Sequence, residues 1–186
     1  AGADALELNV FFLPADPMVA GAEIERQYLS VVRDVAEKVS VPVAVKISTH
    51  FTSPLNMIQG IRQCGAEGVV MFNRFYEPDI NTDSVQVMEA DIFSTSADLR
   101  GSIRWIAMAS AAFPDLDIAA STGVHTGADA VKVLLAGASA FEVCSAIYHN
   151  GLGVIDRING YLSGWMTEHR FTSISEFCGR LNYRSV

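Results

Sequence analysis

The sequence predicts an α/β fold in which parallel strands alternate with helices. Three stretches begin with Gly-Ala and continue into an apolar segment, at residues 2–9, 65–73 and 137–144. Glycine just past a helix end accommodates the left-handed cap conformation, and a buried parallel strand is a short apolar run. Each repeat therefore marks a helix-to-strand junction. The segments between have helical periodicity, and this alternation favours parallel pairing with right-handed crossovers.

Two further strands fit between the repeats, at residues 41–47 and 116–120, so that five are expected. Such an alternation suits either a doubly wound sheet or a (β/α)8 barrel, which has eight strands and typically about 250 residues. In a barrel the five strands would be the last five, with three missing upstream. The chain begins at Ala1 rather than methionine, and we expect it to be the later part of a longer protein.

The helices are predicted from apolar stripes and capping signals. A stripe over residues 24–39 has acidic residues at its start and a lysine at its end, as the helix dipole prefers. Ser-Pro at 53–54 opens a helix that runs to residue 63, and capping-box patterns at 95–98 and 126–129 open two more. Later helices are expected over 154–166 and from 173. The long connection at 74–92 contains an apolar segment, 85–88, that is expected to be an inserted strand or a hairpin.

Composition excludes several function classes. The 186 residues contain 13 basic and 21 acidic side chains, a net charge of −8 with no basic run, which argues against a nucleic-acid surface. Cys64, Cys144 and Cys178 match no zinc or disulfide spacing, and four scattered histidines make no metal site. No apolar run approaches the roughly 18 residues of a membrane span. We expect one cytoplasmic domain over residues 1–186, with no metal, membrane or nucleic-acid partner.

Residues 116–151 form the stretch around which the chain is organised, a predicted strand-turn-helix-strand unit. Its turn, residues 121–127, combines small residues with hydroxyls and lies where backbone N–H groups at a helix N-terminus can hold an anion. One hypothesis is a phosphate-binding turn for a nucleotide-like cofactor. The alternative is that Gly123 and Gly127 serve only tight-turn geometry.

Three side chains near this turn are candidates for phosphate contacts. His125 lies within it and could supply a donor. Ser145 follows the last strand and is a better hydrogen-bonding group than its neighbour Cys144, which we expect to be a small apolar residue at the strand end.

Lys46 is the charged residue of the second strand. Alternation places Ala44, Lys46 and Ser48 on one face and the apolar residues 43, 45 and 47 on the other. In a barrel, Lys46 would point inward near the C-terminal end of its strand, where the active sites of barrel enzymes lie. Its positive charge would then contact an electron-rich cofactor ring or an anionic substrate. The alternative is an interior ion pair with Glu7 or Glu142, because buried charges are normally paired. Lys46 can also form such an ion pair and contact a ligand at the same time.

Other polar residues follow the strands. Asn9 and Asn73 end their strands in matching places, where each either serves the site or caps a loop. His50 lies four residues after Lys46. A loop histidine is more often a solvated side chain than a catalyst, although its ordinary pKa suits proton transfer.

Five segments together resemble the dihydroorotate dehydrogenase family, in order and spacing, over nearly the whole chain. They are Ala-Leu-Glu-Leu-Asn at 5–9, Val-Ala-Val-Lys-Ile-Ser at 43–48, Val-Met-Phe-Asn at 70–73, Thr-Gly-Val at 122–124, and Leu-Ala-Gly-Ala at 135–138 running into Val-Cys-Ser-Ala at 143–146. The resemblance implies a (β/α)8 TIM barrel that holds FMN at its C-terminal mouth. This chain would supply about the last five strands and their helices.

The resemblance also implies site residues. Lys46 would contact the flavin ring, with Asn9 and Asn73 facing the substrate over it. The implied cofactor-binding residues are Lys46, Thr95, Ser96, Thr122, Gly123, Cys144 and Ser145, of which Thr122, Gly123, Cys144 and Ser145 would hold the FMN phosphate and the turn at Thr95 and Ser96 would lie near the ribityl chain.

The sequence departs from the family at several of these positions. The family usually has Gly-Gly where this chain has Thr122-Gly123, and Gly-Thr where it has Cys144-Ser145. After Asn9, where the family carries the Ser or Cys that removes a proton from dihydroorotate, this chain continues Val-Phe-Phe-Leu-Pro over residues 10–14. Phenylalanine and leucine cannot accept a proton, which makes His50 a candidate for the missing base.

These observations lead to two functional hypotheses. The first is an FMN-dependent oxidoreductase, of the group known from pyrimidine biosynthesis, that transfers hydride between flavin and a small anionic substrate that need not be dihydroorotate. Arg74, beside Asn73, indicates an anion of another shape, and the resemblance implies a homo-oligomer, a dimer. The second is a non-catalytic flavin- or phosphate-binding barrel or partner subunit, which the phenylalanines at 11 and 12 favour. A third reading is that the residues are only a fragment, with an open barrel edge.

Overall fold

A parallel sheet of five strands forms the centre of the computed structural model, which describes residues 2–182. Residues 1 and 183–186 of the predicted domain lie outside the described range. The strands are β1 (Leu6–Asn9), β2 (Val43–Ile47), β3 (Gly68–Met71), β6 (Asp117–Ala120) and β7 (Ala140–Phe141). They neighbour one another in chain order, and every pair is parallel. The predicted α/β class and all five predicted strands are confirmed.

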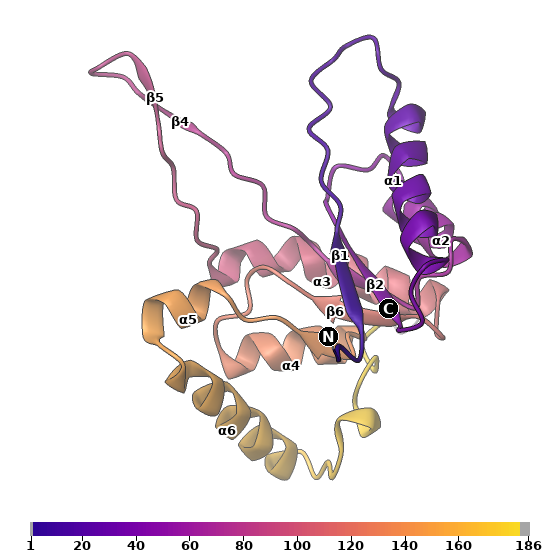
Figure 1. The fold of residues 1–186 in the computed structure, drawn as a ribbon. Helices are drawn as coiled ribbons and strands as arrows, with labels where there is room; N and C mark the ends of the chain where they lie inside the picture. The colour runs from indigo at the N-terminus through magenta and orange to yellow at the C-terminus, as the bar shows by residue number, and fades with distance from the viewer. Residues whose placement is uncertain (1, 183–186) are drawn as a thin grey trace.

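The helices form a layer that follows the same order (Figure 1). They are α1 (Gly21–Ala36), α2 (Pro54–Gln63), α3 (Leu99–Ala112), α4 (Gly127–Ala136) and α6 (Gly153–Glu168). Each contacts the next, α1 with α2, α2 with α3, α3 with α4 and α4 with α6. A doubly wound sheet reverses its strand order and carries helices on both faces. The sheet of residues 2–182 has no such reversal, so the doubly wound alternative does not apply to it.

Strand β2 shows why the sheet buries one face against the helices. Val43, Val45 and Ile47 are at most 2% exposed, whereas the residues between them are half-buried. The three apolar side chains belong to the main hydrophobic core together with buried residues of α1 and α2. Burying each stabilises the fold by about 1.5–3 kcal/mol. The predicted facing of residues 43–47 is confirmed, whereas Ser48, predicted on the face of Lys46, is itself buried.

Some predicted boundaries are wrong. The last strand was expected over residues 140–144, but β7 ends at Phe141 because Cys144 becomes the N-cap residue of α5 (Ser145–Asn150). The backbone N–H of Glu142 still donates to the Ala120 carbonyl at 2.8 Å, which extends the pairing by one residue. The first helix begins at Gly21, ahead of its apolar stripe, and ends at Ala36.

The connection at 74–92 forms an antiparallel hairpin. Its strands are β4 (Asp79–Asn81) and β5 (Gln86–Met88). Asn81 Oδ1 accepts from the backbone N–H groups of Asp83 and Ser84, which holds the turn. The hairpin projects away from the sheet (Figure 1). Over residues 2–182, no helix has both the length and the apolar character needed to cross a membrane.

Both predicted capping boxes are present. Thr95 and Asp98 cap the 3-10 helix η1 (Ser96–Asp98), and Thr126 and Asp129 cap α4. A second 3-10 helix, η2 (Ile174–Glu176), follows α6. Asp129 is buried, and its Oδ2 accepts from the hydroxyls of Thr126 at 2.8 Å and Ser96 at 2.7 Å. One carboxylate therefore ties η1 to the start of α4.

Replacing Asp129 with alanine should lower the free energy of unfolding at pH 7 by about 1–3 kcal/mol, because capping bonds and a buried acceptor are lost together. Burial raises the pKa of Asp129, but hydrogen bonds from Ser96, Thr126 and Lys132 outweigh burial and leave that pKa lowered. The carboxylate's contribution is therefore complete above its unfolded pKa of about 3.9 and is lost as the pH falls through the lower folded value.

Urea unfolding followed by circular dichroism at several pH values tests this expectation. The difference between the wild type and Asp129→Ala should be constant from about pH 5 to 8 and shrink below about pH 4. Asp156→Ala, at an exposed acid in the first turn of α6, is the matched control and should change little. A difference that does not shrink in acid would contradict the role of the charge.

Candidate functional site

Lys46 lies at the carboxyl end of β2 between two carboxylates. Its Nζ is 2.5 Å from Glu142 Oε2 and 3.5 Å from Glu7 Oε1. The interior ion pair that the alternation of β2 predicts is therefore present, with both partners. Burial pushes the pKa of Lys46 down, but the hydrogen bond and attraction of Glu142, assisted by Glu7, outweigh it and raise the pKa. The ammonium group thus stays charged at neutral pH.

The pKa values of the two carboxylates, Glu7 and Glu142, shift in opposite directions. Burial, and then the neighbouring Glu142, raise the pKa of Glu7. Burial also acts to raise the pKa of Glu142, but hydrogen bonds from Glu7, Lys46 and Ser121 outweigh burial and lower it. Glu142 is therefore the firm counter-ion of Lys46, and Glu7 is the carboxylate that takes up a proton first as the pH falls.

A cavity of about 190 Å³ opens beside this ion pair. It brings together six of the predicted site residues, Lys46, Asn73, Thr122, Gly123, Cys144 and Ser145. They come from the ends of β2 and β3 and from the connections after β6 and β7. The carboxyl ends of neighbouring parallel strands thus converge on one space.

At both glycines of the turn after β6, a side chain would clash with a neighbouring residue. Gly123 has φ +95°, and a Cβ there would lie 2.7 Å from the backbone nitrogen of Leu99. A Cβ on Gly127 would lie 2.3 Å from the Cβ of Tyr161, because α6 packs against that point. Turn geometry thus accounts for Gly123, and helix packing rather than turn geometry accounts for Gly127, so the phosphate hypothesis depends on the donors around them.

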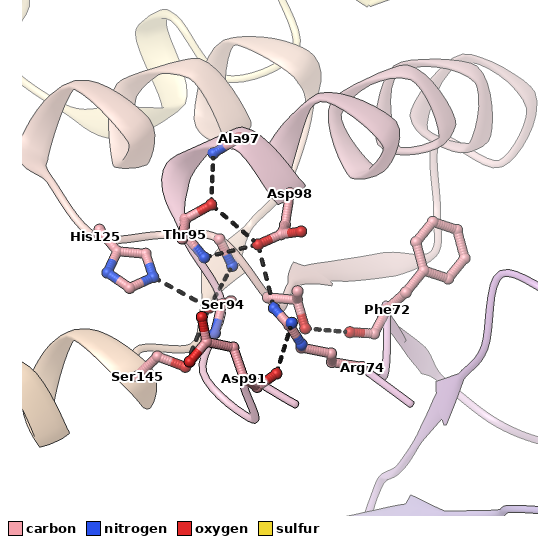
Figure 2. Close-up of polar contacts among 11 residues, drawn as sticks. Phe72, Arg74, Asp91, Ser94, Thr95, Ala97, Asp98, His125 and Ser145 are labelled. Atoms are coloured by element: carbon pink, nitrogen blue, oxygen red, sulfur yellow. Dashed lines mark hydrogen bonds and ion pairs between the residues drawn. The ribbon is translucent and has the colours of Figure 1, made fainter. Parts of the chain in front are cut away.

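Ser94 connects those donors, and sequence reasoning missed it. This buried serine accepts from the Gly123 N–H at 3.3 Å, and its hydroxyl donates to Ser145 Oγ at 3.1 Å (Figure 2). His125 Nε2 lies 3.0 Å from the same hydroxyl oxygen. The groups predicted to bind phosphate, in Gly123, His125 and Ser145, therefore converge on one oxygen atom, Ser94 Oγ. The signal in the sequence was the run of three hydroxyl residues at 94–96, of which only Thr95 and Ser96 were predicted to contact the cofactor.

Thr95 and Ser96, the predicted ribityl contacts, do not line the cavity. The Thr95 side chain accepts from the backbone of Ala97 (Figure 2), and Ser96 Oγ donates to Asp129. Both hydroxyls thus organise η1 and position the adjacent Ser94.

The two strand-end asparagines contact each other. Asn73 Nδ2 donates to Asn9 Oδ1 at 2.6 Å. A second cavity, of about 200 Å³, shares Asn73, Arg74 and Thr122 with the first and also reaches His50. The two spaces therefore adjoin, and Asn73 faces both.

Arg74 is held by the segment that follows the hairpin. Its guanidinium donates to Asp98 Oδ2 at 3.3 Å and to the Asp91 carbonyl at 3.1 Å (Figure 2). Asp98 compensates part of its charge, and the remaining N–H groups of the guanidinium are free to bind a ligand in either cavity.

His50 lies apart from the ion pair. It lines the second cavity but not the first, and its ring stands edge-on to Phe75 with centroids 4.6 Å apart. Phe11 packs against the same Phe75 ring, also at 4.6 Å. The segment after Asn9, where the resemblance implies a Ser or Cys in the family, thus contributes an aromatic contact in this chain.

The donor set suits a phosphorylated cofactor. Lys46 supplies positive charge, while the Gly123 N–H and the hydroxyls of Ser94 and Ser145 supply hydrogen-bond donors. Within residues 2–182, no three His, Cys, Asp or Glu side chains gather in a way that could hold a metal ion.

The sequence is similar to those of known proteins. A family model for dihydroorotate dehydrogenase matches residues 3–166. The catalytic subunit of dihydroorotate dehydrogenase B (NAD(+)) from Pyrococcus abyssi is 28% identical over 193 residues, covering 95% of this chain and 60% of that protein. Its counterpart from Thermoplasma volcanium is 26% identical and covers 96% of this chain and 60% of that protein. Dihydroorotate dehydrogenase (fumarate) from Lachancea kluyveri is 36% identical over 69 residues, covering 37% of this chain and 22% of that protein. The chain thus spans about 60% of the length of the archaeal relatives.

Proposed function

The chain belongs to the dihydroorotate dehydrogenase family, and we propose that it supplies the last five strands of an FMN-binding (β/α)8 barrel as a single domain. The strand order supports this, because a barrel adds each strand beside the preceding one. The layer of consecutively contacting helices supports it as well, because a barrel carries its helices in one outer ring. The site then lies at the carboxyl ends of the strands.

The residues around the first cavity fit FMN. The Ser145 hydroxyl would donate to the phosphate, and the Gly123 N–H and the Ser94 hydroxyl would exchange their present bonds, to Ser94 Oγ and Ser145 Oγ, for bonds to it, with Thr122 and Cys144 nearby. Thr122 Oγ1 donates to the Phe72 carbonyl at 2.9 Å, so this side chain fixes the turn and leaves phosphate binding to its neighbours. The cavity is smaller than the roughly 300 Å³ at which ligand sites begin, so the part of the cofactor beyond the phosphate and Lys46 would extend outside it.

The proposed reaction is hydride transfer between a small substrate and flavin, and FMN supplies the redox chemistry. The observation that carries the proposal is the position of Lys46, a charged ammonium fixed by Glu142 in the cavity that also holds Asn73 and the phosphate turn. Lys46 would stabilise negative charge on the reduced ring. Asn9 and Asn73, joined by their hydrogen bond, would orient the substrate.

The substrate is proposed to be an anion that need not be dihydroorotate. Arg74 lines both cavities and provides the positive charge for it. His50 shares the second cavity with Asn73 and Arg74, so that it can reach a substrate held there as the general base. Phe11, in the segment after Asn9 where the resemblance implies a Ser or Cys base, packs against Phe75.

That aromatic pair also favours a second candidate function, a flavin-binding barrel without turnover of its own, such as a partner subunit. Phe11 is 54% exposed and offers no proton acceptor. A cytoplasmic location and a homo-oligomer, a dimer, stay predictions.

A visible absorption spectrum of the purified full-length protein tests the cofactor first. We expect flavin bands, and we expect them to bleach when the right reductant is added without oxygen. Titration with dihydroorotate then tests whether this molecule or another anion is the substrate. Bleaching by dihydroorotate would mean that another group, such as His50, replaces the missing base. Bands that persist with every small anion tried would favour the non-catalytic barrel. A colourless protein that does not take up added FMN would refute both flavin proposals.

A further inference from the structure

A further cavity of the described residues lies outside the ion-pair site. Its volume is about 450 Å³, and it is enclosed by the segment after β1, the start of α1 and the loop after β2. Most of its lining is apolar, including Phe12, Leu13, Ile24, Tyr28, Phe51 and Phe75. A cavity of about 150 Å³ holds a benzene molecule, so this one has room for a substituted ring.

The cavity adjoins the proposed substrate site. His50 and Phe75 line both this cavity and the second cavity, which holds Asn73 and Arg74. A molecule bound at Asn73 would reach the apolar space by passing the His50 and Phe75 rings.

Aromatic walls are fixed in place around the space. Tyr28 packs edge-on against Phe12, with ring centroids 4.9 Å apart, and against Phe51 at 5.3 Å. The backbone N–H of Phe12 donates to Tyr28 Oη at 3.2 Å, which ties the segment after β1 to α1. Edge-to-face contacts of this kind are the arrangement in which a further ring packs favourably.

Charge sets the orientation of an occupant. The lining includes the acidic Glu25 and no lysine or arginine, which disfavours an anion there. The positive guanidinium of Arg74 lies in the adjoining cavity. An amphipathic anion would therefore place its charged end at Arg74 and its apolar end among the aromatic rings.

We propose that the cavity at the ends of β1 and β2 is a subsite for an aromatic group of the substrate. The proposal rests on the proposed function, since it takes Asn73 and Arg74 to hold the anionic end. It names the substrate class as a carboxylate or similar anion that carries an aromatic ring, which is larger than the small anion predicted from the sequence.

Ligand-observed NMR titration of the full-length protein with two probes tests the subsite without turnover. The probes are 3-phenylpropionate and propionate, which share a carboxylate and differ by the ring. We expect 3-phenylpropionate to bind at least tenfold more tightly, because its ring leaves water. Equal affinities would overturn the proposal.

Two variants locate the binding. Gly21 lines the cavity, and a Cβ built there meets nothing within 4 Å, so Gly21→Leu should fill the mouth without strain. This variant should reduce the affinity for 3-phenylpropionate to that for propionate. Gly160→Leu, in α6 with equally open surroundings, is the control and should bind like the wild type.

Val19→Trp provides a second way of filling the cavity if Gly21→Leu is poorly folded by circular dichroism. Tight binding of 3-phenylpropionate that survives a folded filling variant would place the ring elsewhere and overturn the proposal. The absorption spectrum reports the flavin separately. Flavin bands with equal probe affinities would therefore refute the subsite alone, and a colourless protein with ring-selective binding would refute the redox function alone.

Discussion

Lys46→Ala should slow flavin reduction by roughly 10²- to 10³-fold, the loss expected when one preorganised group that stabilises developing charge is removed. The effect is expected in the rate of reduction because Glu142 and Glu7 hold the ammonium beside the proposed flavin site before any substrate binds. Stopped-flow absorbance under anaerobic conditions, with the reductant identified by the spectral screen, measures it. Lys132→Ala, at a lysine on α4 that is 57% exposed, is the control.

The same change should also destabilise the protein, and a double variant separates the two effects. Without Lys46, the half-buried Glu142 loses its partner, which costs about 1–3 kcal/mol, reduced by the solvent that still reaches it. Adding Glu142→Gln removes the unpaired charge. We expect Lys46→Ala with Glu142→Gln to recover stability in urea unfolding but not the rate of reduction. Recovery of both would mean that Lys46 acts only on folding, and unchanged reduction in the single variant would remove it from the mechanism.

Gly123→Ala should have the largest effect on stability and should abolish retention of FMN. The residue has φ +95°, where a side chain costs about 1–2 kcal/mol. The new Cβ would lie 2.7 Å from the Leu99 backbone nitrogen, and overpacking of this kind adds about 1–3 kcal/mol. Because Leu99 begins α3, neither element can yield without moving the other.

Urea unfolding and the flavin content of the purified protein measure the two consequences of Gly123→Ala. The turn also orients the Gly123 N–H toward Ser94, so a displaced turn loses a donor for the proposed phosphate. Gly160→Ala is the matched control, since its Cβ meets nothing within 4 Å, and it should stabilise α6 slightly. A Gly123→Ala protein that unfolds like the wild type and keeps its flavin would contradict the assigned role of the turn.

The parts of the site that were predictable follow from local rules. The facing of Lys46 follows from the two-residue period of β2, and its nearby carboxylates follow because buried charges are normally paired. The turn at Thr122 and Gly123 follows a strand and precedes a capped helix, a pattern that sequence displays directly.

Other parts depend on residues that are far apart in the chain. Ser94 contacts Gly123 across 29 residues and Ser145 across 51. Arg74 and Asp98 are joined because the hairpin returns the chain to η1; the sequence indicated an inserted strand or a hairpin here but not this contact. Thr95 and Ser96, predicted as cofactor contacts, point instead to Ala97 and Asp129, because the direction of each hydroxyl depends on how η1 packs.

By itself, the sequence determined the α/β class, the five strands and their order along the chain, the helix caps and the family. Periodicity, capping and turn preferences are properties of short segments, so they can be read without knowing what a segment packs against. Only the tertiary structure decided that the strands neighbour one another in chain order, that Ser94 gathers the donors of the turn, and that Tyr28 and Phe12 enclose an aromatic cavity beside Asn73. Those features arise where distant segments meet, and the packing that brings them together is set by the whole core.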